Sequence, residues 1–453
     1  MQRDSQFLGT EKIGKLLFKL ALPAVTAQLV NMLYNLVDRV YISRIPEIGT
    51  MALAGVGICF PLIMLVSAFA ALVSMGGAPR ASIAMGAGER DRAEKIMGNC
   101  CTLLLIVAAL LTAAVLIWQR PILLFFGANA DTLPYGIEYM RIYAIGTVFV
   151  QLALGMNAFI TAQGFATTSM LTVLIGAVLN IALDPLLIFG FGMGVRGAAL
   201  ATILSQAVSA VWVIWFLRGK KTGLKLEIKN FRLKSEWILP CLALGVSPFI
   251  MQATESAISI CFNRSLDAYG GTLAVGAMTI LSSVMQFAML PLTGLTQGAQ
   301  PIVSFNFGAR NAQRVKEAFF KLLKVCLCYS VGLWLAVMLA PGLFARLFTP
   351  DEELIAFTAR ALRIYMAAEL IFGVQIACQQ TFIAIGNAKC SLFLALLRKV
   401  ILLIPLIFLL PTLIADKTTA VYLAEPVADT IAVTVTALLF VRQFRRALKE
   451  IGG

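Results

Sequence analysis

GGAPRASIAMGAGERDRAEK (residues 76–95) and GAQPIVSFNFGARNAQRVKE (residues 298–317) are two copies of one segment. Pro79 in the first copy matches Pro301 in the second, 222 residues later (301 − 79 = 222). Further matches at the same spacing are the tripeptide RIY at 141–143 and 363–365, and Gly164 with Gly386. Matches in several separate regions at one constant spacing indicate that the whole chain is a duplicated sequence.

The composition places this duplicated chain in a membrane. Of its 453 residues, 60% are hydrophobic and 13% are charged, and the mean hydropathy is +0.88. A soluble domain of this length needs about twice that share of charge to cover its surface. A soluble enzyme, a disordered protein and a fibre are therefore excluded, and the chain is predicted to cross a membrane many times.

Apolar stretches of about 20 residues, the length needed to cross the hydrocarbon, recur along the whole chain. Each is predicted to be a helix, because lipid offers no partner to an open backbone. We expect twelve, at 16–42, 52–76, 97–118, 138–162, 170–190, 195–218, 238–265, 274–297, 319–340, 361–385, 391–414 and 417–441. The expected fold class is an all-α membrane protein with twelve transmembrane helices.

The repeat divides these spans into two lobes of six. We expect an N-lobe at 1–220, a cytoplasmic linker at 221–234 and a C-lobe at 235–453. Six is an even number, so both lobes begin on the same side and are parallel repeats about an axis along the membrane normal. Two such lobes leave a central cleft, which is the architecture of an alternating-access carrier rather than of a single-pore channel.

Lys and Arg predict the orientation. The termini and the loops on their side of the membrane carry 22 Lys and Arg residues, including Arg3. The loops on the other side carry 7. By the positive-inside rule, both termini should be cytoplasmic. The same loops explain the net charge of +14. We expect them to contact anionic lipid, and we expect no nucleic-acid partner.

The composition also excludes several kinds of site. The chain has no His, so His-based acid–base catalysis and His-ligated metals are excluded. Its nine cysteines form no CxxC pair and mostly lie in apolar runs, so we expect small buried hydrophobic residues rather than metal ligands or disulfides. Residues 1–10 are polar, and no removable signal peptide is expected.

Asp38 is a charged residue inside the first predicted span. Charge in a span is costly, so an acid there is a functional candidate. Asn31, Asn35 and Asp38 are spaced by four and three residues and therefore share one helix face. The alternative interpretation is that Asp38 caps a helix end or pairs with Arg39.

Asp184 is the second such acid, in the fifth predicted span. Asn180 lies one turn before it, and Pro185 follows it and could break the helix, freeing carbonyls that help to coordinate a cation. With amide and hydroxyl oxygens nearby, Asp38 and Asp184 would suit Na⁺; in an apolar wall, they would suit a proton. We expect the two carboxyl groups to be close in space.

Neutral polar residues accompany these acids. Asn157 and Thr161 are one turn apart in the fourth span, and Thr202 and Gln206 in the sixth. Taken alone, each pair is typical of hydrogen bonds between helices.

The second half carries a different set of polar residues. Asn263 stands at the position of Asp38, 225 residues on, and the acids are Glu255 in the seventh span and Glu369 in the tenth. Further charges occur in the last two spans, namely Arg398, Lys399, Glu425 and Asp429. The plain interpretation of that last group is an internal ion-pair network joining two helices. Met285 and Met289 are either core filler or part of a flexible wall for substrates of varied shape.

Several motifs resemble the multidrug and toxic compound extrusion (MATE) transporters, and in particular a bacterial branch of that family. The motifs are YNLVDRVYIS (34–43), LNIALDPLLIFGFGMGVRGAALATILSQ (179–206), PIVSFNFGARN (301–311) and AEPVADTIA (424–432), and the resemblance runs over nearly the whole chain. The resemblance implies two six-helix lobes and cation-driven export of drugs.

The resemblance also implies a site. The first-lobe cation site of the family matches this sequence at Asp38, Asn180, Asp184 and Thr202, and a helix 4 Asn matches at Asn157. Part of the family also uses an acid in helix 7, near Glu255 here, and one in helix 10, where residues 372–373 offer none. Our second tier of substrate or coupling candidates is Asn157, Tyr34, Glu255, Gln252, Met285 and Met289.

The sequence thus predicts a monomeric, multi-pass antiporter of the bacterial cytoplasmic membrane, neither an enzyme nor dependent on a cofactor. It would exchange H⁺ or Na⁺ for amphipathic, often cationic, organic compounds. The first alternative is a flippase for lipid-linked oligosaccharides, which would need a cationic cleft for pyrophosphate. The second is an intramembrane enzyme acting on lipids, for which we find no nucleophile with a base and no acidic metal motif.

Overall fold

The computed structural model describes residues 6–452, and every regular element in that range is a helix. Arg3, one of the basic residues used to predict the orientation, lies outside the described residues. The all-α membrane fold expected from the sequence is confirmed. The apolar helices bury only part of their surface inside the protein, which leaves the remainder to lipid.

The first bundle consists of the helices up to Arg218. They are α1 (Phe7–Thr10), α2 (Ile13–Ser43), α3 (Gly49–Gly86), α4 (Arg90–Phe125), α5 (Leu133–Ile145), α6 (Thr147–Ala162), α7 (Ala166–Pro185), the π-helical turn η1 (Leu186–Gly190) and α8 (Val195–Arg218). A short 3₁₀ helix, η2 (Ile228–Phe231), lies in the connection to the second bundle.

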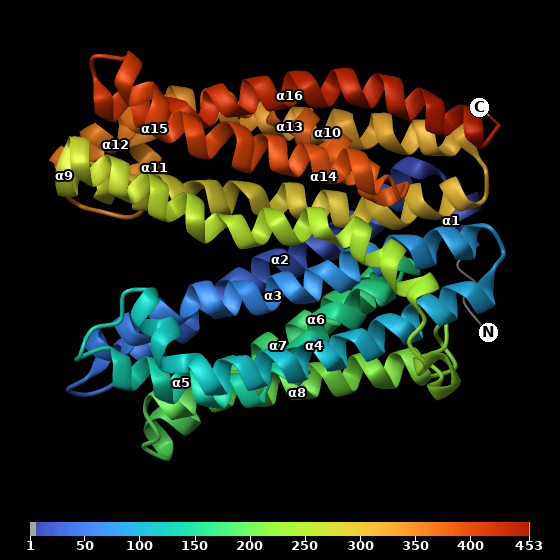
Figure 1. Ribbon diagram of the computed structural model, residues 1–453, viewed down its shortest axis with the longest axis horizontal. Helices are drawn as coiled ribbons and strands as arrows, with labels where there is room; N and C mark the ends of the chain where they lie inside the picture. Colours follow the sequence, from blue (N-terminus) through green and yellow to red (C-terminus); the bar gives the residue numbers. More distant parts are fainter. Residues whose placement is uncertain (1–5, 453) are drawn as a thin grey trace.

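The second bundle begins at Ser235. It contains α9 (Ser235–Gly308), α10 (Ala312–Leu339), α11 (Pro341–Arg346), α12 (Glu352–Tyr365), α13 (Glu369–Ala384), α14 (Ala388–Leu396), the π-helical segment η3 (Leu397–Leu403), α15 (Ile404–Leu413) and α16 (Lys417–Glu450). The two bundles lie one above the other in Figure 1.

The number of membrane crossings depends on α9. Among the described residues, nine helices are long and apolar enough to span, or eleven when each bent pair counts as one span. The 74 residues of α9 would reach about 110 Å as one straight helix, far more than a bilayer needs. Gly271 interrupts it with φ 62° and ψ −158°, a conformation that glycine tolerates. The total of twelve stays a prediction, in which α9 supplies two crossings.

Two expected spans are bent helices. The predicted span 138–162 is α5 and α6, which meet at 57°, and 361–385 is α12 and α13, which meet at 50°. The joints, at Gly146 and Ala368, are 222 residues apart (368 − 146 = 222), so the bend belongs to the repeat. No proline marks either joint, and the sequence analysis missed both. The expected helix break at Pro185 is wrong. The α-helix α7 continues to Pro185, and the π-helical turn η1 follows it directly.

The two copies of the quoted segment pack against each other where the bundles meet. A methyl group on Gly86 would lie 1.9 Å from the carbonyl oxygen of Phe305, and one on Gly308 would lie 1.9 Å from that of Ile83. The two contacts are equivalent under the repeat, because Gly86 corresponds to Gly308 and Ile83 corresponds to Phe305. Only glycine lets the backbones approach so closely. Gln28 adds a bond from α2, with its Nε2 3.1 Å from Gln297 Oε1.

These contacts lie toward the end of the molecule that carries both termini. From that end the ribbons of the two bundles diverge toward the opposite end, where α9 turns at Gly271 (Figure 1). We call the end with the glycine contacts the joined end, and the end at which the ribbons diverge the separated end.

Helix α1 touches both bundles at the joined end. A Cβ on Gly164 of the first bundle would meet the Phe7 ring at 2.5 Å. On the other side, the Leu8 carbonyl accepts hydrogen bonds from Asn306 Nδ2 (2.9 Å) and from an Arg314 Nη (3.0 Å). The start of the described chain is thus fixed to a residue some 300 positions away in sequence.

The connection between the bundles is docked on the first one. The backbone N–H of Leu224 donates to Gln163 Oε1 at 2.7 Å, and that of Lys234 donates to Asn99 Oδ1 at 2.8 Å. These bonds fix both ends of the segment that the sequence analysis treats as a linker.

The cysteines behave mainly as expected. Six of the nine are buried, Cys261 and Cys390 are half-buried and Cys328 is exposed, and all nine are free thiols. Within residues 6–452 no three Cys, Asp or Glu side chains converge as metal ligands.

Candidate functional site

Asp38 and Asp184 are brought together from α2 and α7, with side chains that face each other closely enough to interact. Asn180 lies one turn before Asp184, and its Nδ2 is 3.5 Å from Asp184 Oδ1 and 3.4 Å from Thr202 Oγ1 on α8. The four residues matched to the family site therefore form one cluster across three helices. The expected proximity of the two acids is confirmed.

Several acceptor atoms of this cluster have no hydrogen-bond partner among the described residues. Asp184 is fully buried and Asn180 is 1% exposed. Within the described chain, Asp38 Oδ1, Asp184 Oδ2 and Asn180 Oδ1 are buried and have no hydrogen-bond partner. Unpaired buried oxygens are costly, so this set of oxygens favours a proton or another small cation as the missing partner.

The alternative roles for Asp38 are not supported. The residue lies inside α2, five positions before the helix ends at Ser43, so it caps neither end. The Arg39 guanidinium lies over the Phe60 ring, 5.0 Å from its centroid, and no ion pair joins it to Asp38 in the part of the chain that is described. Asp38 is thus a carboxyl group without a basic partner.

Two tyrosines belong to the same cluster. Tyr34, a second-tier candidate, lies one turn before Asp38 and is influenced by its charge. Tyr139 on α5 was not predicted; it is 3% exposed, its hydroxyl reaches Thr202, and it lies near Asp38. Its only signal in the sequence is its place just before the repeated RIY tripeptide.

Asn157 has a different role. Its Nδ2 lies 2.9 Å from Ser169 Oγ, and Thr161 Oγ1 lies 2.8 Å from the same atom. These bonds join α6 to α7, as the interpretation of hydrogen bonding between helices predicted. No bond among the described residues links Asn157 to the Asp38 cluster.

The acids of the second bundle are paired with basic residues. Arg398 donates from Nε to Asp429 at 2.5 Å and from Nη2 to Glu425 at 3.1 Å. Its guanidinium also covers the Phe372 ring at 4.5 Å. The predicted ion-pair network between the last two spans is confirmed.

Glu255 is also paired, through Lys399, whose Nζ lies 2.6 Å from Glu255 Oε1. The sequence analysis left it open whether this acid meets a cationic substrate or bonds within its own lobe, and in this structure it does the second. Gln252 is exposed nearby, and the half-buried Met285 and Met289 pack on the cores of the second bundle as filler.

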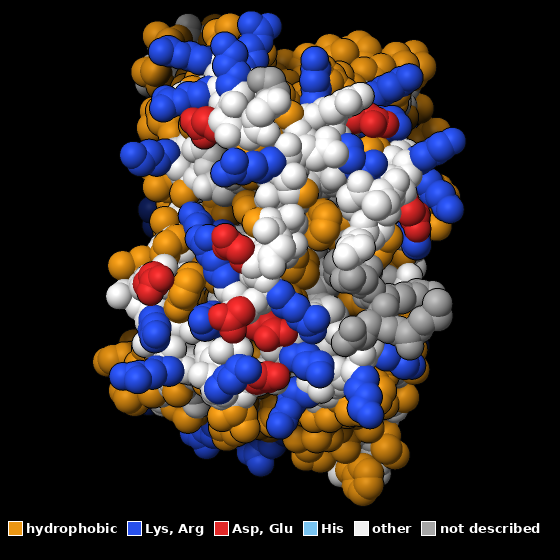
Figure 2. Space-filling model, turned by 90° about the vertical axis from the view of Figure 1, so that its right-hand side faces the viewer, with side chains coloured by type: hydrophobic (Ala, Val, Ile, Leu, Met, Phe, Trp, Pro, Cys, Tyr) orange, Lys and Arg blue, Asp and Glu red, His pale blue; other side chains and the backbone are white. Residues whose placement is uncertain are grey.

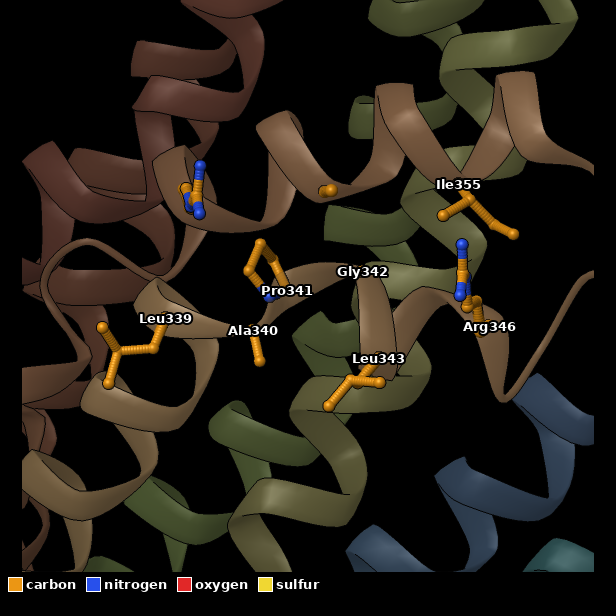
Figure 3. Close-up of a pocket in the computed structure, with 9 residues that line it drawn as sticks. Leu339, Ala340, Pro341, Gly342, Leu343, Arg346 and Ile355 are labelled. Carbon is orange, nitrogen blue, oxygen red and sulfur yellow. The ribbon is translucent and has the colours of Figure 1, made fainter.

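One pocket shares no lining residue with either cluster. It has a volume of about 390 Å³ and lies where α10, α11 and α12 meet (Figure 3). Leu339, Pro341 and Leu343 line it, with Arg346 at one side. No acid lines it, and Arg346 is already 3.5 Å from Glu352. We assign it no part in the candidate site.

A duplicated, all-helical membrane protein whose first bundle holds an acid pair with no ion-pair partner among the described residues has the features of a carrier. The family model MatE matches residues 23–186 and 248–409. The chain belongs to this family, and the resemblance found in the sequence is confirmed.

Named relatives agree with this assignment. The multidrug export protein MepA of Staphylococcus haemolyticus is 24% identical over 414 residues, covering 91% of this chain and 90% of the relative. A crystal structure of MATE in the bent conformation matches with a TM-score of 0.93 at 23% identity, covering 100% of both chains. The outward-facing conformation of a multidrug resistance MATE family transporter matches at 0.90 and 23%, covering 99% of each chain.

Proposed function

We propose that this protein is a cation-coupled antiporter that exports amphipathic, often cationic, organic compounds. The observation that carries the proposal is the buried pair Asp38–Asp184, with three oxygens that lack donors. Family membership supports a transporter rather than an enzyme. The relatives named as multidrug export proteins support drugs as the substrate class.

The coupling ion, H⁺ or Na⁺, binds at the cluster in the first bundle. Two carboxylates face each other with no ion pair to a basic residue in the described chain, so a cation lowers the cost of their burial and mutual repulsion. Asp38 and Asp184 supply charge, and the free Asn180 Oδ1 with Thr202 Oγ1 supplies neutral oxygens. Na⁺ and H⁺ both fit this donor set.

Helix α2 links ion binding to the arrangement of the bundles. It carries Asp38 and, about 15 Å earlier along its axis, Gln28, which bonds to the second bundle. An ion that binds one arrangement of α2 more tightly shifts the population toward that arrangement. Alternating access then consists of opening the joined end while the separated end closes.

The charge distribution favours this proposal over a flippase. A pyrophosphate group needs free cationic side chains, and both basic residues buried in the second bundle, Arg398 and Lys399, already contact acids. The exposed Arg264 is a single cation and makes no site for two phosphates.

We place the protein in the bacterial cytoplasmic membrane as a monomer, with both termini cytoplasmic. Figure 2 views the joined end, and Lys and Arg side chains are spread over it and outnumber Asp and Glu. Such a surface fits the cytoplasmic leaflet and its anionic lipids.

The test is drug flux in proteoliposomes with an imposed H⁺ or Na⁺ gradient. We expect uptake against a drug gradient with one of the two ions, and its loss in the Asp38→Asn protein at equal incorporation. Drug flux that ignores both gradients in the wild-type protein would contradict coupling.

A further inference from the structure

The charge cluster of the second bundle has more acids than basic residues. Glu369, Glu425 and Asp429 are buried, as are the two bases, Arg398 and Lys399, and the fourth acid, Glu255, is 61% exposed. Arg398 is shared by the two acids of α16, and Lys399 is taken by Glu255. Both basic side chains therefore already form ion pairs, and Glu369 has no ion-pair partner among the described residues.

Glu369 is buried without a partner for its carboxyl group. It is 2% exposed, and among the described residues its Oε1 has no hydrogen-bond partner. The groups that face it are Asp429 and Glu425 from α16, Arg398 from η3 and Tyr329 from α10. Tyr329 donates its hydroxyl to the Ala288 carbonyl at 2.9 Å, so it does not satisfy Glu369. From α9, the Glu255–Lys399 pair reaches the same Arg398.

A third carboxylate beside one shared arginine is unfavourable in a buried site, because like charges repel and burial disfavours ions. A bound proton removes the charge and turns the carboxyl group into a donor. We infer that Glu369 is a proton-binding site, separate from the Asp38–Asp184 pair.

This site differs from the one that the family resemblance implies for a second lobe. That site needs an acid in helix 7 and one near residues 372–373. Here Glu255 of α9 is held by Lys399 at 2.6 Å, and the later position carries Phe372, whose ring lies under Arg398. Glu369 instead faces the acids of the last helix.

The position of Glu369 gives the proton a mechanical consequence. Glu369 is the first residue of α13, directly after the 50° bend from α12. Loss of its proton creates a charge that competes with Glu425 and Asp429 for Arg398. Arg398 lies in the π-helical segment η3, so the competition acts on the packing of η3 against α16 and against the bend.

The test measures protonation directly and needs no transport, so it does not depend on the proposed export. Infrared difference spectra of purified protein detect the carbonyl stretch of a protonated carboxyl group. The background is Asp38→Asn with Asp184→Asn, which removes the acid pair of the first-bundle site. We expect a protonated-carboxyl band that persists in this background and is lost on adding Glu369→Gln.

Two further variants keep the test decisive. Glu353→Gln, an exposed acid on the neighbouring α12, should leave the band unchanged. Glu369→Asp, which keeps an acid, should shift the band and covers the case in which the Gln variant fails to fold. A band that is missing from the background protein, or unchanged by both Glu369 substitutions, would overturn the inference.

Discussion

In the first bundle, Asp38 and Asp184 face each other with no ion pair to a basic residue among the described positions. In the second, Arg398 and Lys399 lie within ion-pair distance of three acids. The two bundles have corresponding helices, corresponding bends and equivalent glycine contacts. The repeat has therefore kept the backbone and changed the surroundings of the buried acids: the described residues give Asp38 and Asp184 no ion-pair partner, whereas Arg398 pairs with Glu425 and Asp429.

The largest effect should come from removing the coupling cation's proposed partner. Asp38→Asn keeps the shape of the side chain but removes its charge, so gradient-driven export should fall by about 10- to 100-fold, the range of typical coupling factors. Drug accumulation in cells at matched membrane expression measures this. Asp131→Asn, an exposed loop acid, is the matched control, and wild-type export by Asp38→Asn would contradict the proposal.

Removing Arg398, the basic residue of the ion-pair network, should instead lower the stability of the protein. Arg398→Met leaves Glu425 and Asp429 buried and unpaired, which should cost about 3–5 kcal/mol of stability. Thermal unfolding in detergent is the measurement. Combining it with Glu425→Gln and Asp429→Asn should recover most of the loss. If the single variant is as stable as the wild type, the network is not what stabilises this part of the bundle.

The glycine contacts test the symmetry of the two bundles. Gly86→Ala and Gly308→Ala place a methyl group at the same distance from the opposing backbone, so each should cost about 1–3 kcal/mol by overpacking. Their unfolding temperatures should fall together. Gly332→Ala, which has open space around it, is the control. A large difference between the two interface variants would show that the repeat is not symmetric at this contact.

The smallest effect should come from Glu255. Its side chain is 61% exposed, so its pairing with Lys399 is worth about 1 kcal/mol after solvent screening. Glu255→Gln should weaken transport less than Asp184→Asn does. Its effect should be larger on the transport of cationic drugs than on that of neutral drugs. Adding Lys399→Met removes the unpaired cation and should restore part of the loss. Dose–response curves for both drug classes decide this, and a Glu255→Gln protein that is inactive for every compound would put the ion site in the other bundle.

Apolar length predicted membrane-spanning helices, and the 222-residue spacing predicted the duplication. Charge inside a span indicated Asp38 and Asp184, and the family resemblance added Thr202 to their site. The pairing of Arg398 with Glu425 and Asp429 was also predicted, because charges inside spans have few ways to be satisfied. The bends at Gly146 and Ala368 were not, since a change of direction without proline depends on tertiary packing. Tyr139 was missed for a similar reason: it is one of three tyrosines spaced by four residues, with Tyr135 and Tyr143, and the sequence gives no sign of which hydroxyl contacts Thr202.

The attachment of α1 has a consequence for how the chain is made. The Leu8 carbonyl has its two side-chain donors at Asn306 and Arg314, and the latter is 306 residues away. At a synthesis rate of about 5–20 residues per second, Leu8 waits about 15–60 s before Arg314 exists. The first helix is thus made first and fixed late, and the contacts of Leu8 are completed only after α9 and the start of α10 have been made.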